Sequence, residues 1–304
     1  EEDFLWDAET ENLADGYKNG LKRFLYRTLS KVTGQKLPWG NLTGIRPTKI
    51  AYGMLDEGRS DAEILDFMEQ SHYVSEEKAL LGIDIAKRER DLLKEIHYEG
   101  GYSLYIGIPF CPTTCLYCSF TSYPIAAFRR QVDAYVDAVI KEMDYVAENF
   151  KDKVLDTVYI GGGTPTTLAP DSLTVHSLAI KRASRLNQWI QENGVSMLHN
   201  TDETMKIAAA GAEKLGMKPY YLYRQKNMSG NFENTGYARP GKYGLYNILI
   251  MEEKQTIVAL GAGSITKRVF PDGRIERCDN VKDVGLYIEK IDEMIERKKE
   301  LFAE

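Results

Sequence analysis

The spacing of apolar residues predicts a helical first third of the chain. Between residues 15 and 97 apolar side chains recur at steps of three and four, as at Leu21, Leu25 and Leu29. This is the spacing of one buried helix face. The pattern predicts four helices, one within 15–34 and the others over 50–58, 61–70 and 75–96.

The period changes at Tyr102. Residues 102–108 alternate and are rich in aromatic and β-branched side chains, which predicts a strand that ends at Pro109. An amphipathic helix is predicted over 132–146 and a second strand over 154–160. Strand, helix and strand in this order indicate a βαβ unit.

Shorter segments with glycine and proline turns make up the remainder. A third strand is predicted over 172–180 and an alanine-rich helix over 201–216. The other predicted elements are strands over 220–224, 244–251, 256–260 and 264–270 and a charged helix over 281–302.

Composition narrows the class of protein. A chain of 304 residues, 43% of them apolar, can bury a sizeable core. The formal charge of −6 gives no basic excess for a nucleic-acid partner. No apolar run approaches the length of a membrane span, and the acidic opening 1–3 is unlike a signal peptide. We therefore expect a cytoplasmic protein with no nucleic-acid partner.

Three of the four cysteines stand in one eight-residue window. Cys111, Cys115 and Cys118 have Cx3Cx2C spacing and directly follow the first predicted strand. Three thiolates can hold a [4Fe-4S] cluster and leave one iron open. The alternative is a zinc knuckle, which needs four protein ligands, but Cys278 and His176 are distant in sequence. The spacing favours the cluster.

A glycine run follows the second predicted strand. Residues 161–166 read GGGTPT, and glycines let the backbone approach a ligand closely. Alone, such a run is as typical of a structural turn as of a binding site. One βα unit after the cysteines, it indicates a ligand site, because ligands bind at the carboxyl ends of parallel strands.

These motifs resemble the radical S-adenosylmethionine (SAM) family of oxygen-independent coproporphyrinogen III oxidases, and most closely its HemZ-type branch, the coproporphyrinogen dehydrogenases. The resemblance covers nearly the whole chain. It rests on residues 105–118 and 161–166, with further matching stretches at 44–49, 171–178 and 236–241.

The resemblance implies a set of site residues and a reaction. Cys111, Cys115 and Cys118 would bind the [4Fe-4S] cluster. The residues expected to contact SAM are Tyr105, Tyr117, Gly162, Gly163 and Thr164. The family transfers an electron from the cluster to SAM, and the resulting 5′-deoxyadenosyl radical converts two propionates of coproporphyrinogen III to vinyls with loss of carbon dioxide. Implied partners are this tetrapyrrole substrate and a low-potential electron donor such as a flavodoxin or ferredoxin.

The implied fold class is α/β, with a partial barrel of the radical SAM (βα)6 type. Here the barrel is incomplete, because the chain passes from Leu168 almost directly into a strand that the family places near the barrel's end. The shortfall is roughly a hundred residues at about 30 residues per βαβ unit. We expect a helical N-terminal module over 1–98, a radical SAM core over 99–218 that is shortened near 168–171, and an α+β C-terminal module over 219–304.

Three functions remain open on the sequence. The first is oxidative decarboxylation of coproporphyrinogen III in oxygen-independent haem biosynthesis. The second is haem delivery without oxidase activity, as in relatives that share the cysteine pattern. The third is an inactive remnant. Gly107 and the stretch 44–49 fit the HemZ-type branch and favour the first.

Overall fold

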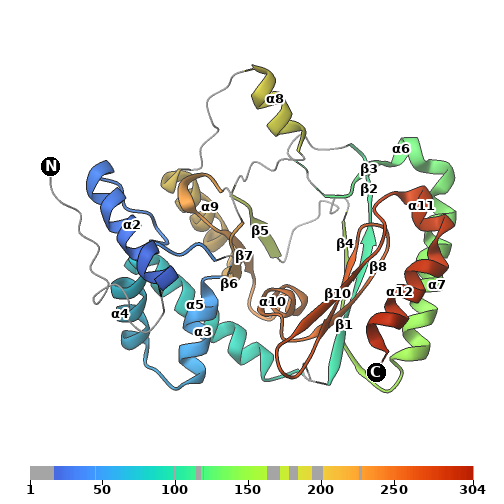
Figure 1. Ribbon diagram of the computed structural model, residues 1–304, viewed down its shortest axis with the longest axis horizontal. Coiled ribbons are helices and arrows are strands. Elements are labelled where there is room, and N and C mark those ends of the chain that lie inside the picture. The colour runs from blue at the N-terminus through green and yellow to red at the C-terminus, as the bar shows by residue number, and fades with distance from the viewer. Residues whose placement is uncertain are drawn as a thin grey trace. The chain divides into compact units, whose positions relative to one another are not determined.

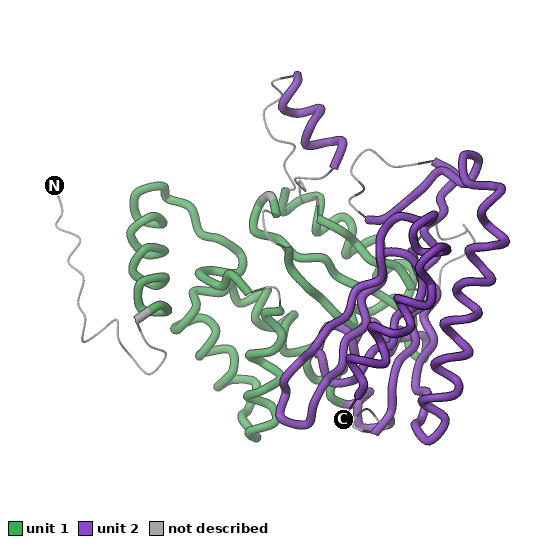
Figure 2. The backbone as a smooth tube through the Cα atoms, turned by 45° about the vertical axis from the view of Figure 1, so that its right-hand side comes forward, with its two compact units in different colours: residues 1–90, 172–179, 198–241 green, residues 91–171, 180–197, 242–304 purple. Residues whose placement is uncertain are grey.

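The computed structural model consists of two compact units, each built from more than one stretch of the chain (Figure 2). Unit 1 comprises residues 1–90, 172–179 and 198–241, and unit 2 comprises residues 91–171, 180–197 and 242–304. The structure describes residues 17–44, 46–96, 98, 100–113, 118, 120–162, 172–177, 184–193, 201–225 and 228–303.

Helices make up the first part of unit 1. The third of them, α4, begins with a capping box in which the Ser60 hydroxyl accepts from Glu63 N–H and the Glu63 carboxylate accepts from Ser60 N–H. Both interactions satisfy amide groups that the first helical turn leaves free. The bounds are α2 Tyr17–Thr33, α3 Thr48–Asp56, α4 Asp61–His72 and α5 Glu76–Leu93. All four predicted N-terminal helices are confirmed.

Unit 1 also contains a small antiparallel sheet with the strand order β5-β7-β6. Leu173 and Val175 of this sheet pack on Ala212 of helix α9. The bounds are β5 Ser172–Val175, α9 Asp202–Lys214, β6 Lys218–Tyr223, the 3-10 turn η2 Ser229–Asn231 and β7 Asn234–Ala238.

The sheet of unit 2 has five strands in the order β10-β9-β8-β1-β4. Strand β1 is central to its parallel part, because it pairs in parallel with β4 on one side and β8 on the other. Strands β9 and β10 extend the sheet in antiparallel fashion. The bounds are β1 Gly101–Ile108, β4 Val154–Gly162, β8 Thr256–Leu260, β9 Ile265–Val269 and β10 Ile275–Asp279.

Helices α7, α11 and α12 cover one face of this sheet (Figure 1). Their apolar side chains pack on Tyr102 and Leu104 of β1 and on Val258 and Leu260 of β8. Helix α10 contacts β4, and its Tyr246 stacks on side chains of the opposite face. The bounds are α7 Val132–Asn149, α10 Leu245–Glu252, α11 Val284–Glu289 and α12 Ile291–Phe302.

The cysteine segment, residues 109–124, and helix α8 complete unit 2. Strands β2 and β3 form a short parallel pair around the cysteines. The bounds are β2 Phe110–Cys111, β3 Tyr123–Pro124, α6 Ile125–Phe128, the 3-10 turn η1 Arg129–Gln131 and α8 Arg185–Asn193.

Strand β4 ends the sheet with an exposed apolar surface. It is the last strand in the sheet order, and Val158 and Ile160 are 54% and 69% exposed. In register they lie beside Leu104 and Ile106 of β1, whose face packs on the helices. Three apolar side chains of α7, Val136, Ile140 and Met143, are exposed as well. An apolar edge of this kind is what the loss of a following βα unit would leave.

Several predicted elements have a different structure. Residues 244–251 were expected to be a strand, but form α10, because a short continuous apolar run does not distinguish a strand from a buried helix. The third predicted strand does not continue the core sheet, because β5 pairs with β7 in unit 1. The C-terminal helix is divided at Lys290 into α11 and α12. Strands β7 and β10 and helix α8 were not predicted.

The two compact units divide the chain differently from the three modules expected at 1–98, 99–218 and 219–304. Residues 172–179 and 198–218 belong with the N-terminal helices, whereas 242–304 belong with β1 and β4. The α/β class is confirmed. The partial barrel and the boundaries of the three modules stay predictions. Among the described residues, no helix has both the length and the apolar character needed to cross a membrane.

Candidate functional site

The two predicted motifs meet at one edge of the unit 2 sheet. Ile108, the last residue of β1, is paired in register with Gly162, the last residue of β4. Cys111 follows β1 within three residues, on β2. The parallel pairing therefore brings the start of the cysteine segment and the start of the glycine run to the carboxyl ends of neighbouring strands, where α/β proteins bind ligands.

Two of the predicted cluster ligands can be described. Cys111 and Cys118 are half-buried and form no disulfide, and Cys118 Sγ lies 3.7 Å from Ser122 Oγ. Cys115 and Tyr117 lie outside the described residues. Among the side chains that are described, no three metal-ligating groups converge. Two uncommitted thiols that flank a third cysteine nevertheless have the donor chemistry that an iron–sulfur cluster requires.

The glycine run has a packing requirement of its own. Gly162 has φ +112°, and a Cβ there would lie 2.3 Å from the carbonyl oxygen of Ile108. A Cβ on Gly161 would lie 2.5 Å from the Tyr159 ring and 2.9 Å from the Tyr105 ring. Both positions need glycine to let β4 end against β1, whether or not a ligand is bound. Gly163 and Thr164 lie outside the described residues.

Tyr105 belongs to a stack of three tyrosine rings. Tyr105 of β1 and Tyr159 of β4 have ring centroids 5.9 Å apart, and Tyr246 of α10 stacks on Tyr159 at 4.5 Å and on Tyr105 at 6.0 Å. Burial raises the pKa of Tyr105, with a smaller contribution from Tyr159. Burial also raises the pKa of Tyr246 well above its ordinary value. Tyr105 and Tyr246 therefore stay neutral, and their rings form part of an apolar stack.

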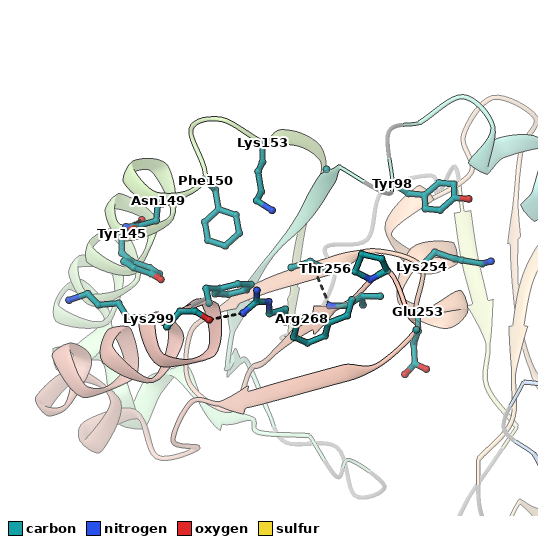
Figure 3. Close-up of a pocket in the computed structure, with 17 residues that line it drawn as sticks. Tyr98, Tyr145, Asn149, Phe150, Lys153, Glu253, Lys254, Thr256, Arg268 and Lys299 are labelled. Carbon is teal, nitrogen blue, oxygen red and sulfur yellow. Dashed lines mark hydrogen bonds between the residues drawn. The ribbon is translucent and has the colours of Figure 1, made fainter.

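A large cavity lies at the opposite edge of the sheet (Figure 3). Its volume is about 1030 Å³, and its lining includes Gly101 and Thr256, the first residues of the parallel strands β1 and β8. Arg268 projects into it but donates to the carbonyl oxygens of Leu301 and Ala303, at the end of α12. Because the cysteines follow the other end of β1, this cavity is not the predicted SAM site.

Sequence comparisons find relatives named as oxygen-independent coproporphyrinogen III oxidases and as haem chaperones. The chain is 27% identical to the oxygen-independent coproporphyrinogen-III oxidase-like protein HemZ of Bacillus subtilis, over 92% of this chain and 80% of that protein. It is 42% identical to the haem chaperone HemW of B. subtilis over 44% of this chain and 38% of that protein. It is 35% identical to the oxygen-independent coproporphyrinogen III oxidase of Pseudomonas aeruginosa over 23% of this chain and 15% of that protein.

The chain is a homologue of the oxygen-independent coproporphyrinogen III oxidase family. The resemblance that the cysteine and glycine motifs predicted is thereby confirmed. No family model matches the chain, and no solved structure matches it.

The length of the strongest alignment agrees with a shortened family member. The alignment to HemZ covers 401 residues, whereas the whole chain has 304, so at least about a hundred positions of HemZ have no counterpart. In the structure β4 is followed by no further strand of its sheet before β8 in the described parts of the chain. Placement of the gap near 168–171 rests on the sequence motifs.

Sequence reasoning missed two groups of residues around the site. Tyr159 and Tyr246, the partners of Tyr105, carried no separate signal among 19 tyrosines. Glu142 and Lys298 were also missed, although each interrupts the apolar stripe of its helix. A single charge on an otherwise apolar helix face indicates a buried partner, and the two charges have opposite sign.

Proposed function

We propose that the chain binds a [4Fe-4S] cluster through Cys111, Cys115 and Cys118, binds SAM beside it, and acts on the propionates of coproporphyrinogen III to form vinyls. The observation that carries the proposal is the register of β1 with β4, which pairs Ile108, three residues before Cys111, with Gly162 of the glycine run. Homology to HemZ over 92% of the chain supports the reaction.

The protein's own part would be to hold and enclose the cofactors. The three thiolates would bind iron, and Gly162 with Gly163 and Thr164 would offer backbone and hydroxyl groups to the methionine end of SAM. Tyr105 and Tyr117 would lie beside SAM. The cluster, when bound, would supply the electron that cleaves SAM, and the protein would contribute placement and exclusion of water.

Tyr246 would support this pocket from α10. Its ring is buried and stacks on Tyr159 and Tyr105, so it fixes the plane of the Tyr105 ring and keeps water from its far side. A low-potential donor such as a flavodoxin or ferredoxin would deliver the electron. The reaction would place the protein in the cytoplasm, in oxygen-independent haem biosynthesis.

Haem delivery is the second candidate function. Its support is the match to the haem chaperone HemW, which is 42% identical over 44% of this chain. A carrier would keep the same cysteines without converting coproporphyrinogen III. An inactive remnant is the third candidate, and the exposed apolar edge of β4 supports it.

The first experiment is anaerobic reconstitution with iron and sulfide, followed by addition of dithionite and SAM. We expect about four irons per chain, the absorption of a [4Fe-4S] cluster, and 5′-deoxyadenosine. Cys118→Ser should lose the cluster. Cys278→Ser should keep it, because Cys278 lies on β10, away from the cysteine segment. A wild-type chain without iron would overturn the proposal, and iron without 5′-deoxyadenosine would overturn its SAM step.

The second experiment separates oxidase from carrier. The reconstituted chain is incubated without oxygen with coproporphyrinogen III, SAM and reductant, and the porphyrins are identified by mass spectrometry. In parallel the chain is titrated with haem. Vinyl products support the oxidase, whereas stoichiometric haem binding without product would replace it by the carrier.

A further inference from the structure

Glu142 is the centre of a buried polar network in unit 2. Glu142 and Lys298 are both fully buried, and Lys298 Nζ lies 2.5 Å from Glu142 Oε1. The same carboxylate accepts from Asn280 Nδ2 at 2.8 Å, from the Tyr287 hydroxyl at 2.5 Å and from the backbone N–H of Gly261 at 2.9 Å. Helices α7, α11 and α12 and the turn after β8 thus share one acceptor.

The turn that Glu142 holds is wedged against the end of β1. Gly261 has φ +95°, and a Cβ there would lie 2.4 Å from the carbonyl oxygen of Gly107. The Tyr135 hydroxyl links the same two segments, because it donates to Gly107 O at 2.6 Å and accepts from Ala262 N–H at 3.0 Å. The network therefore fixes the turn 261–264 relative to the strand that leads into the cysteines.

The same turn also supports the far side of the cysteine segment. A Cβ on Gly263 would lie 2.4 Å from Thr121 Oγ1, three residues after Cys118. Gly263 N–H donates to Val281 O at 2.8 Å, and the Tyr123 hydroxyl donates to the next carbonyl, that of Lys282, at 3.1 Å. The end of β1 before the cysteine segment and residues Thr121 and Tyr123 at its far end thus contact backbone that the Glu142 network holds.

A buried ion pair is a poor device for stability alone. Apolar residues of similar volume in its place are often neutral or stabilising, because the desolvation of both charges is then avoided. An apolar replacement for Glu142 would, however, leave Gly261 N–H without an acceptor. We propose that Glu142 is a positioning residue for the cysteine segment, acting through the turn 261–264, with Lys298 as its buried ion-pair partner. The purpose of this positioning would be cluster assembly, and in this respect the proposal rests on the proposed function.

The test compares two double variants that are both uncharged at this site. Glu142→Gln with Lys298→Met keeps a carbonyl oxygen that can accept from Gly261 N–H, whereas Glu142→Met with Lys298→Met removes it at similar volume. In each the alkylation rates of Cys111 and Cys118 are measured by mass spectrometry in native, iron-free protein. Thermal unfolding of both variants is recorded alongside.

We expect Cys111 and Cys118 to react at least about tenfold faster in the methionine pair than in the glutamine pair, because local opening of the turn no longer breaks a satisfied hydrogen bond. Iron uptake in reconstitution should fall in the same order. Equal alkylation rates in two variants that both unfold cooperatively would overturn the proposal and leave Glu142 a packing residue.

A matched control lies in unit 1. Glu233 is buried there with Lys78 at 2.7 Å, so Glu233→Gln with Lys78→Met removes a similar ion pair. It should leave the reactivity of Cys111 and Cys118 unchanged, whatever its effect on stability. If the wild-type chain takes up no iron but the two unit 2 variants still differ in alkylation, the proposed function fails and the positioning role stands.

Discussion

Each compact unit buries one carboxylate against one lysine, and the two networks differ in what else they bind. Glu233 of unit 1 accepts from Lys78 Nζ and from Trp39 Nε1 at 2.8 Å, so its partners are side chains. Glu142 of unit 2 also accepts from a backbone N–H, that of Gly261. The first network joins Lys78 of α5 and Trp39, in the loop between α2 and α3, to Glu233, the residue before β7. The second sets the course of the backbone beside the cysteine segment. A buried carboxylate and lysine thus link side chains of different elements in unit 1, whereas in unit 2 they also fix the position of the backbone.

Removal of either lysine alone should give the largest effects. Lys298→Met leaves the Glu142 charge uncompensated in the core and should cost about 3–5 kcal/mol of unfolding free energy. Lys78→Met should cost about 3 kcal/mol of unfolding free energy, the lower end of the same range. The reason is that the Lys78 side chain is 7% exposed, whereas that of Lys298 is 0% exposed. Urea denaturation measures both. A larger loss for Lys78→Met would reverse the ranking of the two networks.

Substitution of the turn glycine tests the backbone role of the Glu142 network directly. Gly261→Ala places a Cβ against Gly107 O and the Tyr135 hydroxyl at positive φ, and should cost about 2–3 kcal/mol. Gly273→Ala is the matched control, since its φ is +81° but a Cβ there meets nothing within 4 Å. It should cost only about 1 kcal/mol. Equal losses in thermal unfolding would mean that the close approach of the turn to β1 is unimportant.

The smallest expected effect on stability concerns an exposed carboxylate, that of Glu63. The backbone N–H and the hydroxyl of Ser60, followed by Arg59, lower the pKa of Glu63. Its ionisation therefore stabilises the fold above the ordinary pKa of a glutamate, and this contribution is lost as the pH falls through the lowered value. Ser60→Ala should return the Glu63 pKa toward its ordinary value in an NMR titration, with the smallest stability loss of the series. Because the variant keeps the backbone N–H, an unchanged pKa would show that the Ser60 hydroxyl does not contribute to the shift.

Much of the local structure was predictable from the sequence, because it depends on neighbouring residues. The strand, helix and strand of β1, α7 and β4 follow from their periodicity, as do the N-terminal helices. The position of Cys111 past a strand end was predictable for the same reason. The run 244–251 was not, because a short, mainly apolar run suits a strand or a helix, and its burial against β4 and β1 decides the outcome.

The pairing of distant segments could not be predicted. β8 joins β1 across about 150 residues, and β5 leaves the core sheet to pair with β7. Nothing in either strand specifies its partner, because short strands rich in β-branched residues have similar sequence patterns whichever strand they pair with. The Glu142 and Lys298 pair was accessible in principle, since both charges stand on apolar stripes, but their contact spans 156 positions. That contact depends on the fold being known.

The pairing of β1 with β8 also orders events during synthesis. Residues 101–124 leave the ribosome first, but β8, the turn 261–264 and Lys298 follow more than 130 residues later. Until then β1 has only β4 as a neighbour in its sheet, and the cysteine segment has no turn to rest on. At about 5–20 residues per second this interval lasts roughly 10–30 s. A chain truncated before residue 256 would therefore lack both β8 and the turn 261–264, and its cysteine segment would have the support of neither.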